Sequence, residues 1–146
     1  MVDFISSLEK GLGAAQQAER NKAEIRSVFS NLNDQLLQAF DGKLEIHIYT
    51  KTNPFSVLVG ISGGQPKPDY QFIGAKNPLA ENKDAVEIAG WKLDPNGYPC
   101  KIVSDESENY CENKEALEQA LQHLLSRPDV GEKLYSLMKR KLKPDA

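Results

Sequence analysis

Residues 23–50, AEIRSVFSNLNDQLLQAFDGKLEIHIYT, change their hydrophobic period part-way along, and this change decides the fold class. Up to Phe40, apolar residues recur three and four positions apart, which is the spacing of an amphipathic helix. Asp41-Gly42 then supplies the left-handed residue that ends many helices. From residue 44 to residue 49, apolar and polar residues alternate, which is the period of a half-buried strand. The stretch therefore predicts a long helix that leads directly into a β-sheet.

The predicted helix is long for its domain. Residues 14–40 would span about 40 Å, whereas a compact chain of 146 residues is roughly 38 Å across. The helix should therefore span the molecule or project from it, and we interpret residues 1–24 as a helical arm. In the first half of the predicted helix, residues 14–24, all the apolar residues are alanines. This half is either a solvated arm, or its small side chains let another helix approach closely. We expect a partner protein, or a second copy in a homodimer, to contact Ala14, Ala18 and Ile25.

The beginning of the arm has two interpretations. Four apolar side chains fall on one helical face, namely Phe4, Ile5, Leu8 and Leu12. Gly11 and Gly13 disfavour a continuous helix, so the pattern predicts a short separate helix before the main one. This segment is either a lid folded on the core or a partner-binding element.

The middle of the chain has the period of strands. Beyond the strand at residues 44–49, we predict strands at 55–61, 70–75, 85–93 and 98–104. Residues 51–54 form a predicted hairpin loop, and the sequence DPNG before Tyr98 is typical of a tight turn. Consecutive strands with short loops favour an antiparallel meander.

Two helices follow the strands. Asn113 is a good N-cap for the first, whose leucines lie on one side. Ser126 is the predicted N-cap of the second, with Pro128 in its first turn. We therefore expect a single α+β domain over residues 1–146. It combines a long N-terminal helix, a five- to six-stranded, mainly antiparallel meander sheet, and a C-terminal helix pair packed on the sheet.

Composition fits one globular domain. With 40% hydrophobic residues in 146, the chain can bury a core without metal or disulfides, so we expect no cofactor. The net charge of -3 argues against general affinity for nucleic acid. No apolar run approaches the ~20 residues that span a bilayer, and Asp3 stands where a secretory signal would carry positive charge. We expect a cytoplasmic protein that does not bind membranes.

The two cysteines are predicted to be neighbours. A two-residue turn at Asp105 and Glu106 would pair Ser104 with Ser107, and hence Cys100 with Cys111. In a reducing compartment we expect free thiols, and a redox-sensitive cross-strand disulfide is the alternative. Zinc binding is disfavoured, because there is no CxxC spacing and no third or fourth ligand.

No catalytic constellation stands out in the sequence. GISGG at residues 60–64 is similar to the nucleophile motif of chymotrypsin-like proteases, but the chain is too short for their double barrel. Ser62 also leads into Gln65-Pro66 rather than into the helix of a nucleophile elbow, so we interpret it as part of a turn. His47 and His123 are interpreted as surface residues without a partner for acid–base chemistry.

Four aromatic residues in the predicted sheet are candidates for an exposed cluster. Trp91 and Tyr98 flank the predicted tight turn, and Tyr49 and Tyr70 lie near the outward face of the strands. They form either an interface cluster or, if helices cover that face, ordinary core. We expect a non-enzymatic protein that binds another macromolecule, as an inhibitor, immunity protein, adaptor or chaperone does. There are two alternatives. One is a small-molecule or nucleotide-binding protein, in which the backbone amides of residues 60–64 and the basic C-terminal residues Lys139, Arg140, Lys141 and Lys143 receive an anionic ligand. The other is an enzyme with an unfamiliar site.

Overall fold

The computed structural model describes residues 1–51, 70–105 and 107–144. The predicted strand at residues 55–61, most of the predicted hairpin loop, Ser62 and Glu106 lie outside the described residues. The elements follow one another in the order α1 (Phe4–Phe40), β1 (Glu45–Lys51), β2 (Tyr70–Lys76), β3 (Val86–Asp94), β4 (Gly97–Ser104), β5 (Ser107–Cys111), α3 (Lys114–Leu125) and α4 (Pro128–Met138). The predicted α+β architecture is confirmed, since a long helix, an antiparallel meander and two C-terminal helices are all present.

Helix α1 is continuous, so the prediction of a separate short helix at its beginning is wrong. Asp3 caps the first turn, where its Oδ1 accepts a hydrogen bond from the Ser6 amide at 3.0 Å. A Cβ at Gly11 or Gly13 would meet nothing within 4 Å, so neither glycine marks a close packing contact. The helix ends as predicted, because Asp41 and Gly42 both have positive φ, at 54° and 80°.

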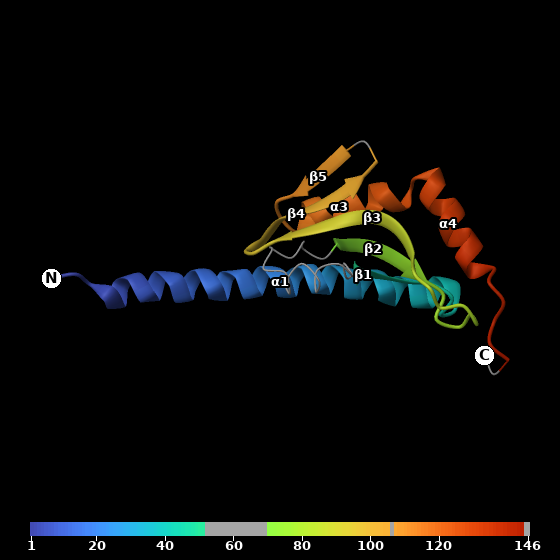
Figure 1. Cartoon of the computed structure of the whole chain (residues 1–146), viewed down its shortest axis with the longest axis horizontal. Helices are drawn as coiled ribbons and strands as arrows, with labels where there is room; N and C mark the ends of the chain where they lie inside the picture. The colour runs from blue at the N-terminus through green and yellow to red at the C-terminus, as the bar shows by residue number, and fades with distance from the viewer. Residues whose placement is uncertain (52–69, 106, 145–146) are drawn as a thin grey trace, which may run out of the picture.

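The five described strands form one sheet in the order β1-β2-β3-β4-β5, with every neighbouring pair antiparallel. One face of the sheet packs against the helices, and its side chains, among them Ile46, Ile73 and Ile102, are buried. Figure 1 shows α1 running along the sheet layer and continuing well past it on the N-terminal side. The long helix therefore projects from the domain, which is one of the two arrangements that its predicted length allowed.

Asn33 fastens α1 to the edge of the sheet. Its side-chain nitrogen donates to the Ile46 carbonyl at 2.8 Å, and its oxygen accepts from the Ile46 amide at 2.8 Å. These two bonds satisfy backbone groups of β1, which is an edge strand with no partner on that side within the described sheet.

The C-terminal helices begin where the sequence predicts, with one correction. Asn113 caps α3, since its side chain accepts from the Ala116 amide at 2.8 Å. Ser126 does not cap α4: it ends α3, and its hydroxyl donates back to the His123 carbonyl at 2.8 Å. Because Ser126 is the C-cap of α3, it is not free to cap α4, which begins at Pro128. Proline is well tolerated at this first helical position.

Within the described residues, no helix is both long and apolar enough to cross a membrane.

Candidate functional site

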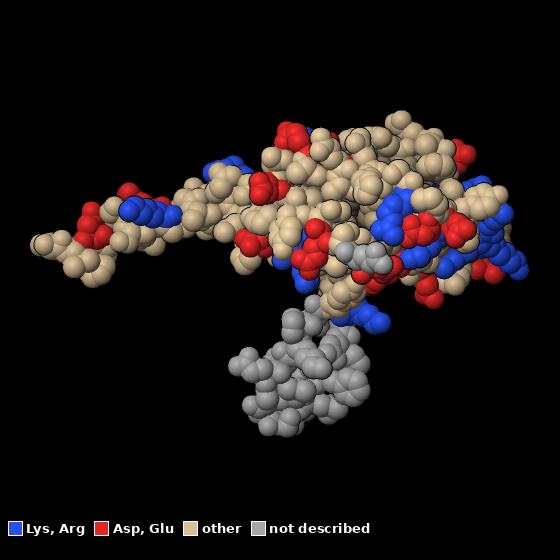
Figure 2. Space-filling model, turned by 90° about the horizontal axis from the view of Figure 1, so that it is seen from above, with Lys and Arg blue, Asp and Glu red and all other residues tan. Residues whose placement is uncertain are grey.

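The most distinctive surface of the molecule is the N-terminal part of α1. Of the arm predicted at residues 1–24, the stretch 4–20 is helical and precedes the first hydrogen bond to the sheet domain, and from here on we call this stretch the arm. Figures 1 and 2 show it extending away from the bulk of the domain, so the interpretation of its first residues as a lid is wrong. Within the described residues, the most N-terminal hydrogen bond from α1 to the sheet domain is at Asn21, whose side-chain nitrogen donates to the Asn96 carbonyl at 2.8 Å. The lid would have required a turn after residue 12, and the continuous helix provides none.

The arm carries large apolar side chains in solvent. Phe4 is 75% exposed, Ile5 65%, Leu8 57% and Leu12 53%. None of them contributes to the core cluster, which α1 joins only through Ile25 and residues after it. These four side chains therefore gain no hydrophobic stabilisation from the core of their own domain, and the helix that carries them is propagated from the packed half of α1.

The exposed side chains of α1 lie along one stripe. At 100° per residue, the members of this stripe fall within one arc of about 100°, and all are exposed. We call this surface the exposed stripe; it consists of Phe4, Ile5, Leu8, Leu12, Ala15, Glu19, Ala23, Arg26, Ser30, Leu37 and Phe40. Lys22 and Asn33 fall in the same arc but are half-buried beside the sheet domain. The stripe thus runs the full length of α1, on the arc next to the one that packs on the sheet.

The residues predicted to bind a partner on α1 belong to the other arc. Ala14 and Ala18 continue the stripe that Ile25 begins, and Ile25 is buried in the core with 3% exposure. Leu37 and Phe40, which are 61% and 40% exposed, were not predicted as surface residues. The adjacent pair Leu36-Leu37 carried the signal, because neighbouring helical residues point about 100° apart and only one of them can face the core.

The four predicted surface aromatics do not share one face of the sheet. Trp91 is buried against α1, with its ring edge-to-face on Phe29 at a centroid distance of 5.7 Å. Tyr98 is half-buried on the same side, and its hydroxyl donates to Glu24 at 2.7 Å. Burial, followed by this bond to Glu24, raises the pKa of Tyr98. For Trp91 and Tyr98 the covered-face interpretation holds.

Tyr49 and Tyr70 lie on the opposite face, in a row of rings. Phe72 stacks between them, with centroid distances of 5.6 Å to Tyr49 and 6.1 Å to Tyr70. Gly74 makes room for the row, since a Cβ there would come within 2.8 Å of the Tyr49 ring. Burial, with a smaller contribution from Glu45, raises the pKa of Tyr49. The row thus lies on the face of the sheet away from the helices, where Tyr49 and Phe72 are half-buried and Tyr70 is 47% exposed.

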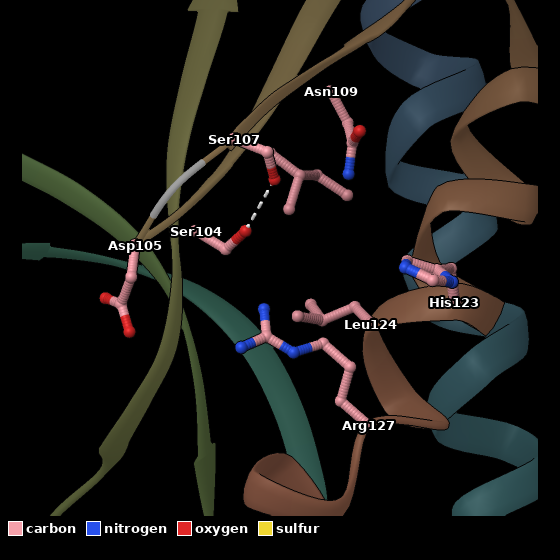
Figure 3. Close-up of a pocket in the computed structure, with 8 residues that line it drawn as sticks. Ser104, Asp105, Ser107, Asn109, His123, Leu124 and Arg127 are labelled. Carbon is pink, nitrogen blue, oxygen red and sulfur yellow. Dashed lines mark hydrogen bonds between the residues drawn. The ribbon is translucent and has the colours of Figure 1, made fainter.

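A cavity of about 440 Å³ opens between the β4–β5 hairpin and the end of α3. Figure 3 shows Asn109, His123 and Arg127 directed toward it, with the Ser104 and Ser107 hydroxyls 3.0 Å apart at its rim. The Arg127 guanidinium is already engaged by Asp129, at 2.9 Å from Nη2. The volume is adequate for a small ligand, but the ion pair neutralises the charge that would attract an anion.

The two cysteines are paired in register as predicted. Cys100 lies opposite Cys111, and Ser104 lies opposite Ser107. Both thiols are free, and their side chains are 0% and 1% exposed. The hydrogen bond with Cys111, together with burial, raises the pKa of the Cys100 thiol. A buried, protonated thiol is a poor nucleophile.

The histidines are not brought together. His47 lies on β1 beside Glu45, with Nε2 at 3.5 Å from the carboxylate, whereas His123 lies on α3 at the hairpin cavity. Among the described residues, no group of three or more His, Cys, Asp or Glu side chains is arranged to hold a metal ion.

No protein-family model, curated protein or solved structure matches this chain. The site must therefore be interpreted from its own geometry.

Proposed function

We propose that this chain is a non-enzymatic binding protein that associates with another protein chain through the exposed stripe of α1, and above all through the arm. The observation that carries this proposal is the exposure of four large apolar side chains, between 53% and 75%, at the end of an ordered helix. Contiguous apolar surface on a soluble protein marks interaction sites. An amphipathic helix presenting anchors three and four positions apart is also a common recognition element.

The free energy available from burying the arm is too small for the arm alone to bind tightly. Covering the four side chains would contribute roughly 1–2 kcal/mol each, or about 4–8 kcal/mol together. Association costs an estimated 4–15 kcal/mol in lost freedom. A stable complex therefore needs contacts beyond the arm, and the remainder of the exposed stripe can supply them.

The test compares tagged wild-type protein with two variants that each add one negative charge to the arm. Leu12→Glu charges the exposed stripe, whereas Gln17→Glu lies on the opposite side of the helix and serves as the control. We expect the wild type and the control to associate, with themselves or with a stoichiometric partner from the native host, and Leu12→Glu to lose that association. Light scattering and pull-down would overturn the proposal if all three proteins stayed monomeric and retained nothing. Equal association by all three would overturn it as well.

A second candidate function is the binding of a small polar molecule in the hairpin cavity, favoured by its volume of about 440 Å³ and by the convergence of Asn109, His123 and Arg127. A thermal-shift panel of metabolites and nucleotides tests it. A ligand at 100 times its dissociation constant should stabilise the protein by about 2.7 kcal/mol, and Asn109→Leu should reduce that shift. A panel without any shift would count against this function.

A further inference from the structure

The exposed stripe of α1 is apolar at both ends and charged between them. Phe4, Ile5 and Leu8 lie at one end, and Leu37 and Phe40, which are 61% and 40% exposed, lie at the other. Between the ends the stripe carries Ala15, Ser30 and two exposed charges, Glu19 and Arg26. Neither charge forms an ion pair with the rest of the described chain. A surface with this arrangement can be complementary to itself.

We propose that the occupant of the exposed stripe is a second copy of this chain, with the two α1 helices antiparallel about a two-fold axis between residues 22 and 23. This inference rests on the proposed function and names its partner. In this register, position i of one copy lies opposite position 45 − i of the other. Leu8 then lies opposite Leu37, and Ile5 lies opposite Phe40. Ile5 and Leu8 of each copy thus cover Phe40 and Leu37 of the other.

The charges select the same register. The antiparallel pairing places Glu19 opposite Arg26 twice, once on each side of the axis. A parallel pairing in register would instead oppose Glu19 to Glu19 and Arg26 to Arg26, and like charges at facing positions are destabilising. Ala15 lies opposite Ser30 between the ion pairs and the apolar ends, and these small side chains permit close approach of the two helices.

The contact is large enough for a reversible dimer. Helix α1 has 37 residues, so it is about 55 Å long and presents a strip roughly 10 Å wide. Two such strips bury about 1,100 Å² in total, which exceeds the ~1,000 Å² expected of a biological interface and lies just below the ~1,200 Å² at which the range of stable interfaces begins, as a reversible dimer requires. Because the domain covers only the half of α1 that begins at Asn21, the arm of each copy reaches the domain-bearing half of the other.

Site-directed cross-linking of the full chain tests the register. Ala15→Cys and Ser30→Cys are small substitutions at exposed positions. The native Cys100 and Cys111 are buried, so the wild-type protein, which has only these two thiols, is the control for background oxidation. Under mild oxidation with diamide, we expect a disulfide-linked dimer when the two variants are mixed and little when either is oxidised alone. Cross-linking of each variant to itself would indicate parallel pairing and overturn the proposal. The absence of any cross-link would also overturn it.

Charge reversal provides an independent measurement. Glu19→Arg and Arg26→Glu should each raise the dimer dissociation constant about tenfold in sedimentation experiments, and the double variant should recover most of the loss. Unchanged dimer affinity in both single variants would contradict this register. If the wild type is monomeric but captures a host protein that Leu12→Glu loses, self-pairing fails while the proposed function stands. If no association of either kind is found, both fail.

Discussion

Two side-chain truncations on α1 should distinguish its exposed stripe from the stripe that packs on the sheet. We call the latter the folding stripe; it consists of Ile25, Val28, Phe29 and Leu36. Ile25 is 3% exposed and belongs to the core, so Ile25→Ala should lower the free energy of unfolding by about 2–5 kcal/mol through lost burial and the cavity left behind. Leu12 is 53% exposed, and alanine is the better helix former. Leu12→Ala should therefore change the free energy of unfolding of the monomer by no more than about 0.5 kcal/mol.

Urea denaturation followed by circular dichroism measures both values, at a protein concentration low enough to keep the chain monomeric. At high concentration the free energy of unfolding should rise more for the wild type than for Leu12→Ala, because association stabilises the folded state by mass action. A loss above 2 kcal/mol for Leu12→Ala at low concentration would refute the reasoning, since the arm would then pack on its own domain. So would a loss below 1 kcal/mol for Ile25→Ala.

Three further outcomes follow from side-chain contacts. Asn33→Ala removes both bonds to Ile46, so it should cost about 1–3 kcal/mol in denaturation experiments and speed hydrogen exchange at the Ile46 amide. Cys100 and Cys111 should react with a thiol reagent at least about 100-fold faster in urea than in the native state, because both are buried; rapid native labelling would contradict this. The raised pKa of Tyr98 favours the neutral phenol in the folded state, so this contribution is complete below pH ~10 and is lost as pH rises above it. Tyr98→Phe should therefore flatten the alkaline fall in stability, and an unchanged slope would argue against that contribution.

The strand register around the cysteines could be predicted because a two-residue turn allows only one pairing of the strands that it joins. Once Ser104 is paired with Ser107, antiparallel counting places Cys100 opposite Cys111, as the structure has it. The change of hydrophobic period at Asp41-Gly42 likewise located the end of α1. In both cases the decisive interaction is local in sequence.

The continuity of the arm could not be predicted from local preference. Gly11 and Gly13 each cost about 1 kcal/mol relative to alanine in a helix interior, and this favoured an interruption. The cost of nucleation, however, is met in the packed half of α1, where Ile25 and the residues after it bury against the sheet. Elongation from that half needs only one further hydrogen bond per residue, and Asp3 caps the free end.

The division of the aromatics between faces depended on contacts across strands. Alternation shows which residues of one strand share a face, but not which face the helices cover. The register shift between Ile73 and Gly74 also changes how β2 and β3 correspond. In the structure Trp91 faces Phe29 of α1, whereas Tyr70 stacks on the other side of the sheet.

The position of the exposed stripe beside the folding stripe has a consequence for how the chain can change. The two stripes occupy adjacent arcs of one helix, and Leu36 and Leu37 mark the boundary: the first is 8% exposed and the second 61%. A substitution on one stripe leaves the other almost untouched, because residues about 100° apart on a helix share few neighbours. The affinity of the exposed stripe for the proposed partner could therefore vary without loss of the fold, whereas a shift of the helix by one residue would exchange core and surface positions from Ile25 onward. The packing of the domain thus fixes the position of the proposed binding surface, and the affinity of that surface is free to vary.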